Sequence, residues 1–135
     1  MRKTAVLIAG SLALLSACSD TLTVDDLAGS YSATTFTTQE GDATTDWLAA
    51  GASIHLTLTA AGNTSGHLFV PGGNEDGSDF DADLTGTWAL AGSQVTFEHA
   101  ADTFLRDMPF TADAGRLTAE GTFSGVTVRV VLERD

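Results

Sequence analysis

The segment that decides the fold is residues 53–59, which read Ser53-Ile54-His55-Leu56-Thr57-Leu58-Thr59. Polar and apolar side chains alternate along it, and a β-strand points successive side chains to opposite faces. One face of this segment therefore suits a core and the other suits solvent. Residues 60–63 follow as a turn signal, so we predict that this strand forms a hairpin with a strand at residues 65–70.

Similar short segments recur on both sides of this hairpin. Pro109 interrupts one of them, which indicates an edge or a bulge because proline cannot donate to a β-ladder. A short helix is predicted at residues 46–50, with Asp46 as its N-cap. The chain is thus predicted to be all-β with about eight strands, the remaining six at residues 29–37, 84–90, 94–99, 104–111, 116–123 and 126–133.

Most of these strands are joined by short turns without a helical crossover, which predicts antiparallel pairing. A flat sheet of eight strands would expose two edges and one apolar face, whereas a closed barrel exposes neither. We therefore favour a small antiparallel up-and-down barrel. A two-sheet sandwich is the alternative, because periodicity alone does not separate the two architectures.

The N-terminal residues carry a targeting signal. Arg2 and Lys3 precede an apolar run at residues 5–15, which is too short to span a bilayer. The run ends in Leu15-Ser16-Ala17-Cys18, which resembles the lipobox of bacterial lipoproteins. An ordinary secretory signal with a stray cysteine and a buried N-terminal helix are the alternatives. The resemblance implies three parts: a signal peptide at residues 1–17, a lipidated Cys18 with its tether at residues 18–28, and a folded domain at residues 29–135.

Lipidation of Cys18, by palmitate or similar chains, would anchor the domain to a membrane of the cell envelope. Ser19 resembles the default outer-membrane sorting signal, so we expect an outer-membrane location facing the periplasm or the surface. Cys18 is the only cysteine in the chain. No intrachain disulfide can therefore form, and no thiol is left for catalysis or metal binding.

The chain is strongly acidic, with 6 Lys+Arg against 18 Asp+Glu and a net charge of −12. Processing at Cys18 would leave four arginines, no lysine and all 18 acidic residues, a net charge of −14. Nucleic-acid binding is excluded as a function, since it needs lysine and arginine to neutralise phosphates. The acidic domain should stand off an anionic bilayer and attract basic partners.

Two short motifs carry a family resemblance. Leu27-Ala28-Gly29-Ser30-Tyr31 and Leu84-Thr85-Gly86-Thr87-Trp88 each open a predicted strand with Gly-x-aromatic. The first resembles the Gly-x-Trp of lipocalins, with Tyr31 in place of tryptophan. In that family the ring plugs the closed end of the barrel, and an arginine of the last strand packs across it; Arg129 and Arg134 lie in the corresponding region. The resemblance implies a lipocalin-like barrel closed by Gly29, Tyr31, Gly86, Trp88 and Arg129.

A barrel mouth is a usual place for a small-molecule site. We expect most aromatic side chains to fill the interior. The residues expected near the open end, where a small apolar ligand would bind, are Trp47, Phe69, Trp88, Phe104 and Met108.

The longest loop, residues 71–83, is intensely acidic. Its carboxylates could contribute oxygen ligands to a hard cation such as Ca²⁺. EF-hand spacing is missing, however, so a solvated loop is the favoured interpretation. The candidate ligands for a cation are Asp76, Asp79, Asp81 and Asp83.

The sequence contains no motif for hydrolase, phosphate-binding or dinucleotide chemistry, and its three histidines lack metal-site spacing. We therefore expect a non-catalytic domain without a cofactor. Three functions remain open. The domain could carry a small apolar ligand, inhibit a basic enzyme such as a lysozyme or a protease, or serve as a structural component of the envelope.

Overall fold

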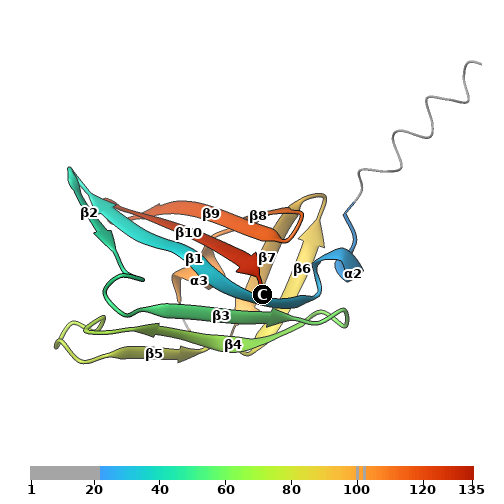
Figure 1. Ribbon diagram of the computed structural model, residues 1–135, viewed down its shortest axis with the longest axis horizontal. Helices are drawn as coiled ribbons and strands as arrows, with labels where there is room; N and C mark the ends of the chain where they lie inside the picture. Colours follow the sequence, from blue (N-terminus) through green and yellow to red (C-terminus); the bar gives the residue numbers. More distant parts are fainter. Residues whose placement is uncertain (1–21, 100, 102) are drawn as a thin grey trace, which may run out of the picture.

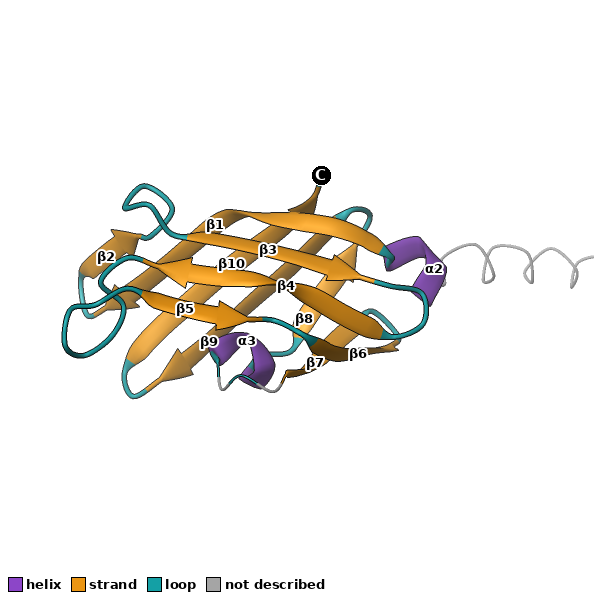
Figure 2. Ribbon diagram, turned by 90° about the horizontal axis from the view of Figure 1, so that it is seen from below, coloured by secondary structure: helices purple, strands orange, loops and turns teal. Residues whose placement is uncertain are grey.

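The structure is a computed structural model that describes residues 22–99, 101 and 103–135. It contains a closed antiparallel barrel of eight strands (Figures 1 and 2), which confirms the predicted fold class. The predicted signal peptide and Cys18 lie outside the described residues. The barrel strands are β1 (Gly29–Glu40), β3 (Ser53–Leu58), β4 (Asn63–Val70), β6 (Gly86–Ala91), β7 (Gln94–His99), β8 (Phe110–Asp113), β9 (Arg116–Phe123) and β10 (Val126–Arg134).

Neighbouring strands follow one another around the barrel in chain order, and β10 pairs with β1 to close it. The closing seam runs from Tyr31 opposite Arg134 to Glu40 opposite Val126. A register shift between Ala33 and Thr35 marks a bulge in β1. Such bulges add twist, which helps a sheet to curl into a barrel.

Two further strands extend the barrel wall at one end. β2 (Ala43–Asp46) pairs with the last four residues of β1, and β5 (Phe80–Asp83) pairs with the end of β4. β5 lies within the stretch predicted as a loop at residues 71–83, so that prediction was wrong at residues 80–83, whereas β6 answers to the strand predicted at residues 84–90. β5 and β6 occupy successive stretches of the same edge of β4. Thr64 lies beside β6 and His67 beside β5.

The core fills the inside of the barrel, as the alternating pattern predicts. Ile54, Leu56 and Leu58 of β3 are buried, and so are Val95 and Phe97 of β7. An eight-stranded barrel has an interior that side chains can just fill. The buried cluster continues through Leu68, Trp88, Phe110, Leu117, Val130 and Leu132.

The described chain also contains two short helices. α2 (Val24–Leu27) begins with a capping box, in which Thr23 and Asp26 exchange side-chain-to-backbone hydrogen bonds. α3 (Phe104–Asp107) occupies the first half of the strand predicted at residues 104–111, so that prediction was wrong there. Pro109 lies between α3 and β8, where the chain needs no ladder donor. Neither described helix is long and apolar enough to cross a membrane.

The helix predicted at residues 46–50 is also wrong. Asp46 ends β2, and the next residues form turns. The Asp46 carboxylate accepts a hydrogen bond from the Ala49 amide at 3.3 Å, as an N-cap residue would. The chain then turns back at Gly51 (φ +106°), a conformation that favours glycine, and enters β3 instead of continuing as a helix.

Candidate functional site

The two ends of the barrel differ, and we name them by their contents. The closed end holds α2, the turn at residues 59–62 and the C-terminal part of β10. The open end holds β2, the loop at residues 71–79 and the turn between β9 and β10. Figure 2 shows α2 and β2 at opposite ends of the long axis.

The closed end is sealed by Tyr31, which is fully buried. Its hydroxyl donates to the carbonyl oxygen of Leu27 at 2.7 Å and accepts from Nη2 of Arg134 at 3.0 Å. The same Nη2 donates to the carbonyl oxygen of Asp26 at 2.6 Å. The Arg134 guanidinium lies 5.4 Å from the centre of the Tyr31 ring, in cation–π range. These hydrogen bonds join β1, α2 and the end of β10.

The cation that packs across Tyr31 is Arg134 and not Arg129, which corrects the predicted closure. Arg129 is exposed on the outer face of β10, opposite Thr37 of β1 and Glu120 of β9. The seam register places the final residue of β10 beside Tyr31, so an arginine five positions earlier cannot reach the ring.

The glycines of the two motifs are required for different reasons, Gly29 for its positive φ and Gly86 for a close approach of the backbone. Gly29 has φ +147°, and a Cβ there would lie 3.5 Å from Nε of Arg134. A Cβ at Gly86 would lie 2.1 Å from the carbonyl oxygen of Glu98. The second site is thus closed to any side chain, because the neighbouring backbone occupies that space.

Trp88 belongs to the closed end, which corrects its predicted place near the ligand. Its side chain is buried, and Nε1 donates to the carbonyl oxygen of Thr59 at 2.9 Å. Its amide donates to the carbonyl oxygen of Gly62, in the turn between β3 and β4. Trp88 therefore plugs the interior beneath that turn.

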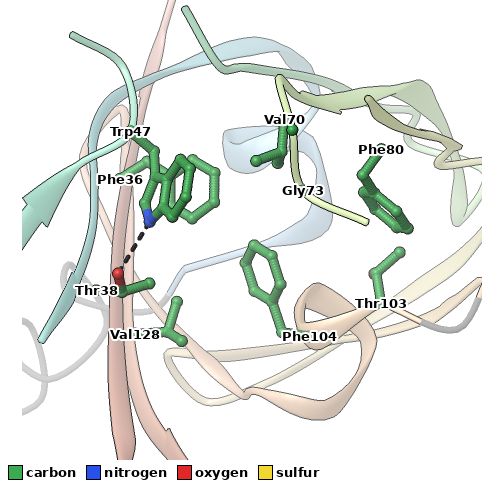
Figure 3. Close-up of a pocket in the computed structure, with 10 residues that line it drawn as sticks. Phe36, Thr38, Trp47, Val70, Gly73, Phe80, Thr103, Phe104 and Val128 are labelled. Atoms are coloured by element: carbon green, nitrogen blue, oxygen red, sulfur yellow. Dashed lines mark hydrogen bonds between the residues drawn. The ribbon is translucent and has the colours of Figure 1, made fainter. Parts of the chain in front are cut away.

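A pocket of about 360 Å³ opens at the other end of the barrel (Figure 3). This volume lies within the range of about 300–1,000 Å³ typical of small-molecule sites. Its walls come from β1, β10, α3 and the segments around β2, β4 and β5. It is lined by Phe36, Thr38, Trp47, Val70, Gly72, Gly73, Phe80, Thr103, Phe104 and Val128.

Three aromatic rings form one continuous wall of the pocket. The Phe36 ring centre lies 6.4 Å from that of Trp47 and 5.4 Å from that of Phe104, and both pairs are tilted. Nε1 of Trp47 donates to Oγ1 of Thr38 at 2.9 Å, drawn as the dashed line in Figure 3. This bond fixes the indole orientation and satisfies its one polar atom.

Of the five residues predicted to contact a ligand, Trp47 and Phe104 line this pocket. Phe69 does not, because it lies on the opposite face of β4 from the buried Leu68 and Val70. Met108 does not line it either, because its side chain is buried against Gly121 of β9, where a Cβ would lie 3.1 Å from its Cγ. The sequence reasoning missed Phe36, Val70 and Val128, which read as ordinary core residues of strands, and Phe80, which fell within the predicted acidic loop.

Two buried polar side chains, one of them in the lining of the pocket, lack hydrogen-bond partners in the described part of the chain. They are Thr103, whose Oγ1 is unpaired, and His99, both of whose ring nitrogens are unpaired. Burial lowers the pKa of His99 below its ordinary value of 6.5, which favours the neutral form of the ring. The imidazole stacks on Phe97 with ring centres 5.3 Å apart. Buried polar groups without partners are unusual in a finished core.

The acidic loop uses its carboxylates locally and separately. Asp76 accepts from Ser78, which lowers the pKa of that carboxyl, and Asp79 accepts from the Gly72 amide at 3.0 Å. Asp81 pairs with His67, and Asp83 accepts from Thr85, which lowers its pKa. Among residues 22–99, 101 and 103–135, no three acidic, histidine or cysteine side chains form a metal-binding group. The carboxylates named as cation ligands thus lie with different partners.

No protein-family model matches the chain, and no curated protein or solved structure is significantly similar to it. The geometry of the barrel and its pocket therefore carries the functional argument.

Proposed function

We propose that this protein is a lipid-anchored envelope protein whose lipocalin-like, non-catalytic barrel binds a small apolar ligand. The observation that carries the proposal is the pocket at the open end. It has the volume of a small-molecule site, six apolar side chains in its walls and two threonines that can orient a ligand.

The pocket keeps its aromatic surface where water can reach it. Trp47, Phe80 and Phe104 are each only half-buried, whereas Tyr31, Trp88, Phe97 and Phe110 are buried. Covering such surface with a ligand is favourable by roughly 25 cal/mol per Å². The unpaired hydroxyl of Thr103 lies in the same wall and is available to a polar atom of a ligand or to a water.

The proposed anchor at Cys18 agrees with the position of the pocket. The described chain enters the barrel through α2, at the closed end (Figures 1 and 2). A tether attached there would hold the closed end toward the membrane and leave the pocket open to the surrounding compartment.

The first test is native mass spectrometry of residues 19–135 purified from the host, a chain that contains every strand and both helices of the barrel. We expect a defined apolar molecule to remain bound after desalting. An unliganded mass that persists after addition of lipids and other apolar molecules would overturn the proposal.

A matched pair of variants assigns the molecule to the pocket. Phe80 lines the pocket, whereas Phe69 on the paired strand β4 does not. We expect Phe80→Ala to lose the bound mass and Phe69→Ala to keep it. Equal retention by both variants would place the ligand elsewhere.

A further inference from the structure

We infer that the ligand is a cationic molecule, with an apolar body in the pocket and an amine or quaternary ammonium group at its mouth. This inference rests on the proposed function and adds the charge of the ligand to it. Three features of the open end carry it: acidic side chains around the mouth, no positive charge in the walls, and exposed aromatic rings.

The segments that supply the pocket residues also supply carboxylates, all of them exposed. Asp46 directly precedes Trp47, and Asp79 directly precedes Phe80 and accepts a hydrogen bond from the amide of Gly72. Glu40 lies on the same face of β1 as the lining residue Thr38, two positions closer to the strand end. We call this set the acidic rim: Glu40, Asp42, Asp46, Glu75, Asp76 and Asp79.

Positive charge does not balance the rim. None of the ten described residues that line the pocket is charged. Arg106 of α3 pairs with the neighbouring Asp107 at 3.0 Å, and Arg129 points outward from β10 opposite Glu120. Arg116 and Arg134 lie at the closed end, where Arg134 holds Tyr31.

This distribution of charge separates ligands by sign. A carboxylate or phosphate entering the mouth would lose water and be repelled by the acidic residues of the surrounding segments, without a positively charged partner among the described lining residues. An ammonium group would keep its water contact at the rim and gain Coulomb attraction. The half-buried rings of Trp47, Phe80 and Phe104 offer it cation–π contacts as well.

The test uses three ten-carbon probes that differ in their head group: decyltrimethylammonium, decanol and decanoate. Binding to residues 19–135 is measured by titration calorimetry, below micelle formation, at low and at high salt. We expect decyltrimethylammonium to bind about tenfold more tightly than decanoate at low salt, with decanol between them. The difference in affinity between these probes should shrink at about 1 M salt, where the Debye length is only about 3 Å.

A rim variant and a matched control locate the effect. Glu40→Gln with Asp42→Asn and Glu75→Gln removes three exposed rim charges that make no hydrogen bond to another described side chain. The control removes three charges at the closed end, through Asp25→Asn, Asp113→Asn and Asp135→Asn. We expect the rim variant to weaken decyltrimethylammonium about threefold to fivefold at low salt, and the control to change its affinity by less than about twofold.

The outcomes separate this inference from the proposed function. If decanol binds but the three head groups bind equally, or decanoate binds best, the charge inference fails and the apolar site stands. If no probe binds, the proposed function fails with it. If the rim variant and the control weaken the cation equally, the attraction comes from net charge and not from the rim, which also overturns the inference.

Discussion

The closed end and the open end of the barrel are built from similar residues but satisfied to different degrees. At the closed end Tyr31 is fully buried, and its hydroxyl has both a donor and an acceptor partner. At the open end Trp47 and Phe104 are half-buried around a pocket, and the hydroxyl of Thr103 has no partner among the described residues. One end is packed as a core, and the other keeps an open pocket and a hydroxyl group without a hydrogen-bond partner among the described residues.

This difference indicates how stability and binding are divided along the barrel. Sequences usually satisfy every local rule except where function requires otherwise. The closed end, with its capping box, buried tyrosine and arginine clamp, obeys those rules. The open end departs from them at Thr103 and in its uncovered aromatic wall, and both departures lie in the lining of the pocket.

Truncating one ring at each end should give the largest contrast. Tyr31→Ala removes a fully buried ring and leaves the Leu27 carbonyl without its donor, so we expect a loss of about 3–5 kcal/mol in the free energy of unfolding. Phe104→Ala removes a half-buried ring beside existing space, and about 1–2 kcal/mol is expected. Urea unfolding of both variants measures the difference.

Tyr31→Phe refines this comparison, because it keeps the ring and removes only the hydroxyl. We expect it to cost about 1–3 kcal/mol, the range for leaving a buried partner unpaired. If Phe104→Ala destabilised the protein as much as Tyr31→Ala, the open end would be part of the rigid core, contrary to the contrast drawn above.

The barrel was predictable because its signal is local. Alternation in β3 and in β7 shows directly which side chains face inward. The antiparallel order then follows from short turns. The prediction was wrong at residues 104–107, because Phe104 and Leu105 suit a buried strand as well as a helix. Thr103 also makes no side-chain capping bond that would mark the start of a helix.

The site was only partly predictable because it depends on register between distant segments. Which arginine reaches Tyr31 is fixed by the pairing of β1 with β10 and by the bulge after Ala33, about 100 residues away in sequence from Arg134. The pocket likewise brings together Phe36, Val70 and Val128 from three strands. Each has an unremarkable local pattern, and only the closed barrel sets them around one space.

The two arginines of β10 give a second, smaller contrast. Arg134→Ala removes hydrogen bonds to Tyr31 and to the Asp26 carbonyl, together with the cation–π contact. Because the guanidinium is partly in water, we expect a loss of about 1 kcal/mol. Arg129 is exposed, so Arg129→Ala should change the free energy of unfolding by less than about 0.5 kcal/mol. Equal effects of the two substitutions would contradict the assignment of Arg134 as the closing residue.

The smallest expected effect concerns pH and the buried His99 at the end of β7. Burial holds the pKa of the folded His99 ring below 6.5, whereas the unfolded chain takes up a proton as the pH falls through that value. The unfolded state then binds more protons than the folded state, so His99 lowers the free energy of unfolding as the pH falls below about 6.5. His99→Leu should flatten this part of the dependence in urea unfolding between about pH 8 and pH 5. If His99→Leu kept the full pH dependence, His99 would not be its source. The folded protein would then accept a proton on this ring as readily as the unfolded chain does, contrary to a buried ring without hydrogen-bond partners.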